Sequence, residues 1–242
     1  MTIILQVAQQ IVTSEEIIPL LAKYQMLPQL AKEIVLDEAI AKIECTPEET
    51  TMARQQFYQQ HQINTEEQLQ AYLQQQGMTP EQLDWQLVRR LKLEKFKQAT
   101  WGKQVEAYFL KRKGQLDRAI YSLIRTQDAG VIQELYFRIQ EGEISFAELA
   151  KQYSQGAEAE TGGLIGPVEL SVPHPLIAQK LAASEPGKLW PPIHVVDWWV
   201  IVRLEKFIAA QLDQPTQQRL IDELFQLWLS QQLQEKVSLQ EI

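Results

Sequence analysis

The first 113 residues carry apolar side chains at the spacing of amphipathic helices. Leu83, Leu87 and Leu91 recur every fourth residue, which places them on one helical face. Residues 46–49 read Thr-Pro-Glu-Glu, a capping box with proline at the first helical position. Residues 64–67 and 79–82 repeat this signal. The pattern predicts an all-helical segment, with helices over 28–43 and from Pro80 to Lys111 and a potential break at Gly102.

The pattern changes near Arg118. Residues 120–124 form a short apolar run that predicts a buried strand, and 199–204 form a second β-prone run. The elements expected between them are helices over 127–140 and 145–154, a glycine-rich strand near 162–166 and a short helix over 175–181. This order predicts an α+β unit between helical flanks.

A single amphipathic helix is expected at the end of the chain, from Pro215 to about Lys236. Its apolar stripe needs a surface to pack on, and the N-terminal helices are the expected partner. The sequence therefore predicts three segments: a helical domain over 1–113, an α+β domain over 114–208, and a C-terminal helix within 209–242.

Charge and composition remove several classes of function. The 242 residues have a net charge of −8, with 31 acidic and 23 basic side chains, so nucleic acid is not an expected partner. Cys45 is the one cysteine, which rules out an intrachain disulfide. The three histidines, His61, His174 and His194, fall in different elements, so we expect neither a metal nor a cofactor.

Nothing in the sequence predicts insertion into a membrane. The first residues lack a basic region followed by a long apolar run, and no stretch approaches the roughly 18 apolar residues of a spanning helix. We therefore expect a cytosolic protein, with its oligomeric state left open.

Several motifs in the α+β segment resemble a known family. Residues 146–154 read Phe-Ala-Glu-Leu-Ala-Lys-Gln-Tyr-Ser, and residues 162–166 read Gly-Gly-Leu-Ile-Gly. Together with Pro186-Gly187, Pro192-Ile193 and the run 199–204, they resemble the signature of parvulin-type peptidylprolyl isomerases over about 117–208. The flanking helices resemble those of bacterial parvulin-type chaperones and foldases, including a cyanobacterial group.

The resemblance implies a four-stranded antiparallel sheet with helices, and a function. Such proteins bind a segment around an X-Pro bond and accelerate its cis/trans exchange, which needs no metal and no covalent nucleophile. The implied partners are unfolded or proline-containing polypeptides, whose folding or export would be assisted. An export partner at a membrane is left open.

The resemblance also places the candidate site. The two histidines common in the family align with Ser122 and Val200, so both imidazoles are missing. The apolar residues of the proline pocket align with Val172 and Leu176, and Trp199 is a candidate aromatic anchor. Ser122 is the one candidate catalytic residue. Two hypotheses follow: a weak isomerase that works by desolvation, or a binding module that keeps the parvulin fold without catalysis.

Other polar and aromatic residues have simpler interpretations. His174, between two prolines, is expected in a surface loop near the pocket rim, with substrate binding as the alternative. Glu158 and Glu160 are expected in a solvated loop. Trp190 and Trp198 are expected in core packing, with a peptide-binding platform as the alternative.

Overall fold

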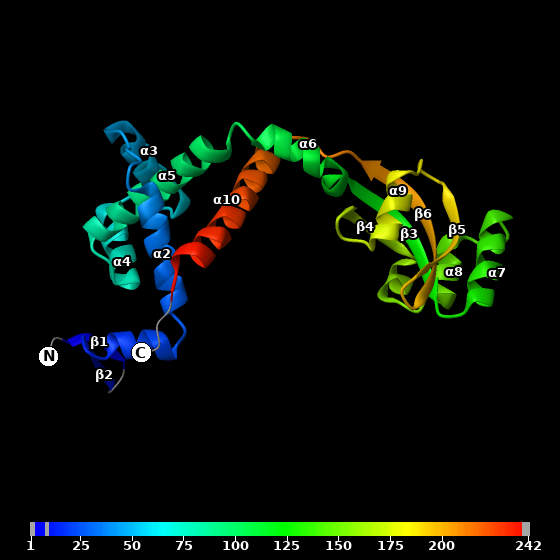
Figure 1. Cartoon of the computed structure of the whole chain (residues 1–242), viewed down its shortest axis with the longest axis horizontal. Helices are drawn as coiled ribbons and strands as arrows, with labels where there is room; N and C mark the ends of the chain where they lie inside the picture. Colours follow the sequence, from blue (N-terminus) through cyan, green and yellow to red (C-terminus); the bar gives the residue numbers. More distant parts are fainter. Residues whose placement is uncertain (1–2, 8–9, 239–242) are drawn as a thin grey trace. The chain divides into compact units, whose positions relative to one another are not determined.

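The computed structural model describes residues 3–7 and 10–238, with side chains from Val12 onward. The chain forms two compact units (Figure 1). The first unit joins residues 1–105 to 217–242, and the second comprises 106–216. The boundaries between the units lie after residue 105 and after residue 216, whereas the sequence suggested boundaries after residues 113 and 208. Each observed boundary falls in the first turn of a helix, over Val105–Leu116 and Gln214–Lys236.

The first unit is mainly helical. A two-stranded antiparallel sheet opens it, formed by β1 (Ile3–Val7) and β2 (Gln10–Thr13). The helices that follow are α1 (Ile17–Lys23), α2 (Leu27–Ile40), α3 (Pro47–Gln60), α4 (Glu66–Gln76), α5 (Pro80–Trp101) and the larger part of α10 (Gln214–Lys236).

The expectation of an all-helical N-terminal segment was wrong for β1 and β2. Both strands are short and rich in isoleucine and valine, whose branched side chains favour extended backbone. The helical spacing that marks the rest of the segment begins only after them. The predicted break at Gly102 is present, because α5 ends at Trp101 and α6 (Val105–Leu116) begins after it.

The capping signals operate as the sequence predicts. The side chains of Thr46, Thr65 and Thr79 each accept a hydrogen bond from the backbone N–H three residues later. The box before α4 is built on Thr65 and Gln68, one residue later than its sequence motif. Each box satisfies backbone donors that a helix start leaves free, which fixes where α3, α4 and α5 begin.

An aromatic cluster joins α5 to α10 inside the first unit. Phe96 and Trp101 of α5 meet Phe225 and Trp228 of α10, with ring centroids 5.2–5.9 Å apart. Such rings bury large apolar areas and gain from edge-to-face contact. The last helix of the chain is therefore part of the core of the first unit.

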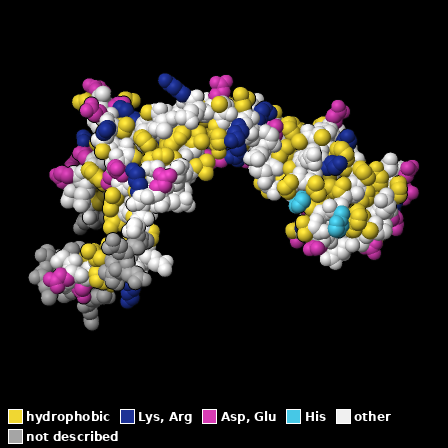
Figure 2. All heavy atoms as spheres, in the orientation of Figure 1, with side chains coloured by type: hydrophobic (Ala, Val, Ile, Leu, Met, Phe, Trp, Pro, Cys, Tyr) yellow, Lys and Arg dark blue, Asp and Glu magenta, His cyan; other side chains and the backbone are white. Residues whose placement is uncertain are grey.

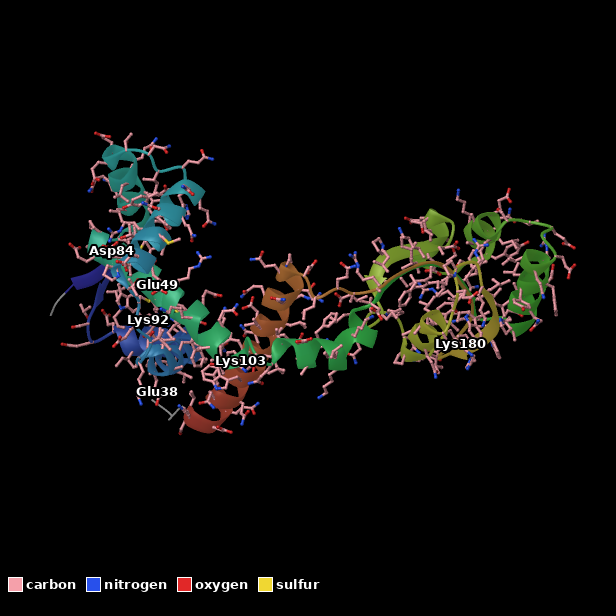
Figure 3. The ribbon with its side chains drawn as sticks, turned by 90° about the horizontal axis from the view of Figure 1, so that it is seen from above. Glu38, Glu49, Asp84, Lys92, Lys103 and Lys180 are labelled. Carbon is pink, nitrogen blue, oxygen red and sulfur yellow. The ribbon has the colours of Figure 1, made fainter. Side chains whose placement is uncertain are left out.

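Ion pairs connect the helices around this core. Arg54 of α3 meets Asp84 of α5 at 2.8 Å, and Lys95 of α5 meets Glu49 of α3 at 2.7 Å. Lys236 of α10 meets Glu38 of α2 at 3.0 Å. The three carboxylates are labelled in Figure 3. Because these pairs are largely solvated, each contributes little to the stability of the unit.

The second unit is an α+β domain built on a four-stranded antiparallel sheet, as predicted. Its strand order is β4-β3-β6-β5, so β3 and β6 are central. The elements are most of α6, then β3 (Arg118–Thr126), α7 (Ala129–Gln140), α8 (Phe146–Tyr153), a 3₁₀ turn η1 (Ala157–Thr161), β4 (Leu164–Glu169), α9 (Pro175–Ala182), β5 (Leu189–Val195) and β6 (Trp198–Ile208).

Two separate cores cover the faces of this sheet. On one face, Ile124 and Ile201 pack with residues of α7 and α8 such as Leu135 and Leu149. On the other face, alternate residues of β3, β5 and β6 pack against Ile177 and Leu181 of α9. Figure 1 shows α9 on the opposite side of the sheet from α7 and α8. In the described residues, no helix is long and apolar enough to cross a membrane.

The aromatic cluster generates a stability prediction. We expect Phe225→Ala to lower the free energy of unfolding of the first unit by about 3 kcal/mol, because it opens a cavity at a side chain only 6% exposed. Leu227→Ala, on the same helix but 59% exposed, is the control and should change it by about 0.5 kcal/mol or less. Hydrogen exchange of the α5 amides measures the effect. Equal effects of the two substitutions would show that α10 does not complete this core.

Candidate functional site

A pocket of about 240 Å³ opens on the face of the sheet that α9 covers. Its walls come from β3, η1, β4, α9, β5 and β6. The lining residues are Tyr121, Leu123, Arg125, Glu158, Ile165, Pro173, His174, Ile177, Val195, Trp198 and Val200. In Figure 2 the two histidines of the second unit, coloured cyan, lie on the surface of this unit beside hydrophobic side chains. The pocket is thus apolar at its base, with a few polar groups at fixed places.

Strand alternation determines which residues reach this pocket. Successive side chains of a strand point to opposite faces, so Tyr121, Leu123 and Arg125 share the face of the pocket. Antiparallel pairing sets Leu123 opposite Val202 and Arg125 opposite Val200. A register shift between Ile120 and Tyr121 precedes the pocket residues of β3.

Trp198 reaches the pocket from the first position of β6. The turn between β5 and β6 has two residues, and Val195 pairs with Trp198 across it. Val196 in this turn has φ 55°, a left-handed conformation that a β-branched residue rarely adopts. The tight connection sets Val195 and Trp198 side by side at the pocket.

An ion pair with a buried carboxylate and a partly exposed guanidinium lies in one wall. Arg125 Nη2 donates to Glu158 Oε2 at 2.9 Å, and the Glu158 side chain is only 5% exposed. Ser154 Oγ donates to the other carboxylate oxygen at 2.6 Å. The guanidinium also lies 5.5 Å from the centre of the Trp198 ring. Charged hydrogen bonds and the aromatic face together offset the cost of burying the two charges.

Gly156 leaves the space that the guanidinium occupies. A Cβ at this position would lie 1.9 Å from Nη2 and 2.0 Å from Nε of Arg125. The same close packing leaves Arg125 Nε buried without a hydrogen-bond partner among the described residues. The glycine is therefore required by the ion pair, and its φ is negative.

The hydroxyl of Tyr121 is a protonated donor in the pocket. Burial raises the pKa of Tyr121 above its usual value, the nearby charge of Glu158 raises it further, and Arg125 partly opposes both. The hydroxyl has no hydrogen-bond partner in the part of the chain that the structure describes. It therefore keeps its proton at neutral pH and is free to donate to a ligand.

His174 is both a helix cap and a pocket residue. Its Nδ1 accepts a hydrogen bond from the backbone N–H of Leu176 at 3.3 Å, which caps α9. The imidazole is exposed and lines the pocket. His174 therefore lies at the surface beside the pocket, and a role in substrate binding stays a prediction.

Ser122 does not lie in the pocket with Val200. It is one residue from Tyr121 on β3, so its side chain points to the other face of the sheet. There its hydroxyl donates to Glu205 Oε1 at 2.5 Å, and the same oxygen accepts from Arg203 Nε at 2.8 Å. A groove that includes both Ser122 and Val200 is therefore wrong, and Tyr121 occupies the place expected for Ser122.

Of the other predicted site residues, only Val200 lines the pocket. Val172 and Leu176 lie beside Pro173 and His174, but they are exposed and outside the lining. Trp199 faces the core of α7 and α8, and its ring lies 4.8 Å from that of His194. Its neighbour Trp198 is the tryptophan that lines the pocket.

Sequence reasoning missed Tyr121 and Glu158. Glu158 was expected in a solvated loop with Glu160, but it is buried and paired. Local sequence carries no sign of this pairing, because Arg125 is 33 residues away and the contact is tertiary. Tyr121 could have been found from the alternation of side chains along β3. It shares a face with the apolar residue Leu123, so it points to the same side of the sheet.

The described residues contain no cluster of three or more histidine, cysteine, aspartate or glutamate side chains that could hold a metal ion. The polar groups available in the pocket are a hydroxyl, an ion pair and an imidazole. They can donate and accept hydrogen bonds and shape an electrostatic field.

Residues 125–206 match the family model of the PPIC-type PPIase domain, also called rotamase. The chain carries a parvulin-type peptidylprolyl isomerase domain. The match covers the helices on both faces of the sheet, β4, β5 and most of β6. It begins at Arg125, so it leaves out most of β3, including Tyr121 and Ser122. No curated protein matches the chain in sequence.

Two solved structures are similar to this chain in fold. The peptidylprolyl isomerase PrsA from Bacillus cereus aligns with a TM-score of 0.53 at 18% identity, covering 99% of this chain and 93% of that one. PrsA from Bacillus anthracis aligns with a TM-score of 0.50 at 20% identity, covering 88% and 100%. At these identities the likeness shows the fold.

The space at Gly156 generates a second prediction. We expect Gly156→Ala to destabilise the second unit by about 1–3 kcal/mol, because the new methyl group displaces the guanidinium from Glu158 and leaves a buried carboxylate unpaired. Gly114→Ala is the control, since its Cβ meets nothing within 4 Å inside α6, and it should be neutral or slightly stabilising. Urea unfolding of each variant measures the change. A neutral Gly156→Ala would mean that the ion pair is not held as described.

Proposed function

We propose that the pocket on the α9 face binds proline-containing segments of unfolded polypeptides. The observation that carries this proposal is its apolar base beside a few oriented polar groups, within a domain of the PPIC-type family. At about 240 Å³ the pocket falls below the roughly 300–1,000 Å³ of sites for drug-sized ligands. That size suits one ring and its neighbouring backbone.

The lining also suits acceleration of cis/trans exchange. Rotation about an X-Pro bond is slow because the twisted amide loses resonance, at a barrier of about 18–20 kcal/mol. An apolar pocket disfavours the charge-separated planar amide, and a hydrogen-bond donor near the prolyl nitrogen favours the twisted one. The hydroxyl of Tyr121 is an uncharged donor among the residues that line this pocket.

Unit one supports binding of unfolded chains more broadly. It exposes several large apolar side chains that an unfolded segment could contact, among them Ile34, Met52 and Trp85. We therefore propose a foldase or chaperone whose clients are polypeptides with exposed apolar and prolyl residues. The cytosolic location and an export partner at a membrane stay predictions.

The adjacent tryptophans allow a matched test of the binding site. We expect Trp198→Ala to weaken binding of a Leu-Pro peptide by about tenfold or more, because it removes a pocket wall. Trp199→Ala removes the same side chain from the opposite face and should change the dissociation constant by less than about threefold. Isothermal titration of the full chain gives both constants. Equal losses would place the peptide elsewhere.

A binding module without catalysis is the second candidate. It is favoured because Ser122 and Val200 stand where two histidines are common in the family, and no residue of β3 or β6 that lines the pocket carries an imidazole. Exchange NMR on the bound peptide decides between the two functions.

If the domain is an isomerase, Tyr121→Phe should lower its turnover by about tenfold, which corresponds to about 1.4 kcal/mol in the transition state. Peptide affinity should stay within about threefold, because the ring remains. Turnover should vary little between pH 6 and 8, since the raised pKa of Tyr121 keeps the donor protonated. Full turnover in Tyr121→Phe would show that the hydroxyl has no role in the exchange.

A further inference from the structure

We propose that Glu158 determines the specificity of the pocket for the residue beside proline. By neutralising Arg125 it makes the pocket accept uncharged residues and disfavour acidic ones. This inference rests on the proposed function, because it concerns the ligand of the same pocket.

The charges of the pocket balance. Among its lining residues, Arg125 is the one lysine or arginine and Glu158 the one acid. The pair sits 2.9 Å apart, so a ligand meets a dipole and no net charge. Without Glu158, the pocket would present an unpaired guanidinium.

Besides Arg125, three hydrogen bonds hold Glu158 in place, one to its carboxylate and two to its backbone carbonyl. Ser154 Oγ, at the end of α8, holds one oxygen at 2.6 Å. The backbone carbonyl of Glu158 accepts from Gly163 N at 2.7 Å and from Thr161 Oγ1 at 3.0 Å. Because side chain and backbone are both bound, Glu158 stays on Arg125 when a ligand enters. The neutralisation is thus built into the fold.

The guanidinium itself remains within reach of a ligand. The Arg125 side chain is 35% exposed, while that of Glu158 is 5% exposed. An acidic ligand side chain that approached Arg125 would therefore face a cation already paired and a buried carboxylate behind it. Repulsion by this carboxylate cancels most of the attraction, so an acid gains little for the water it loses.

The two single charge variants should shift selectivity in opposite directions. Glu158→Gln keeps the size of the side chain and an acceptor for Ser154, but frees the cation, so peptides with glutamate before proline should bind better. Arg125→Gln frees the carboxylate, so peptides with lysine before proline should bind better. In each variant, the affinity for the favoured charged peptide, divided by the affinity for the glutamine peptide, should rise on the order of tenfold at low salt. This increase should be smaller at high salt.

The test titrates the full-length chain with the peptides Ala-Xaa-Pro-Phe, where Xaa is Leu, Gln, Glu or Lys, at pH 7. The wild-type chain should bind the Leu and Gln peptides more tightly than the Glu peptide. The double variant Arg125→Gln/Glu158→Gln carries neither charge and should return to the ranking of the wild type. Ser154→Ala removes one hydrogen bond to Glu158 without changing charge, so it should shift the ratio of the Glu and Gln affinities by less than Glu158→Gln does.

The outcomes separate the two proposals. If no peptide binds the wild-type chain, the proposed function fails. If the Leu peptide binds but neither single variant changes the ratios to the Gln peptide, Glu158 does not set specificity. If Glu158→Gln fails to fold, Arg125→Gln and the double variant still decide. A wild-type preference for the Glu peptide overturns the inference directly.

Discussion

The central strands β3 and β6 are buried on both faces, and this constraint organises the second unit. The side chains that point to one face of the sheet pack in the core with α7 and α8, and those that point to the other face pack in the core with α9. Each strand therefore contributes to two different environments within a few residues. The pocket exists on the α9 side, where the short helix α9 leaves part of the sheet uncovered between His174 and the turn at Val196.

This constraint explains why the ion pair in the wall of the pocket matters. The side chain of Arg125 points to the face of the sheet that α9 covers, so its cation lies beside the apolar core. A charge there is costly unless it is paired and hydrogen-bonded. Glu158 and Ser154 supply those partners, and Gly156 supplies the room. The segment from the end of α8 through η1 is thus shaped around one side chain of β3.

The sequence predicts the elements of the fold well, because local signals determine them. Capping threonines mark the starts of α3, α4 and α5, and apolar spacing marks α10. The likeness of residues 146–166 to the parvulin signature leads to the correct sheet and strand content. The sequence did not predict the hairpin of β1 and β2, because these strands are too short to show the alternation of apolar and polar residues typical of a strand.

The site was harder to predict, because a shift of one residue along a strand exchanges its faces. Alignment on a motif placed a histidine position at Ser122, whereas the neighbouring residue Tyr121 is the one that lines the pocket together with Val200. The same shift separates Trp199 from Trp198. Glu158 was out of reach for another reason, since its burial depends on a contact between distant segments.

Chemical-shift mapping of the full chain with an Ala-Leu-Pro-Phe peptide tests the central claim most directly. If the pocket on the α9 face is the binding site, the largest changes fall on Tyr121, Arg125 and Trp198. The side chains on the other face, Ser122 and Trp199, should change little beyond what their neighbours impose. Changes concentrated at α7 and α8, or only in the first unit, would contradict this account.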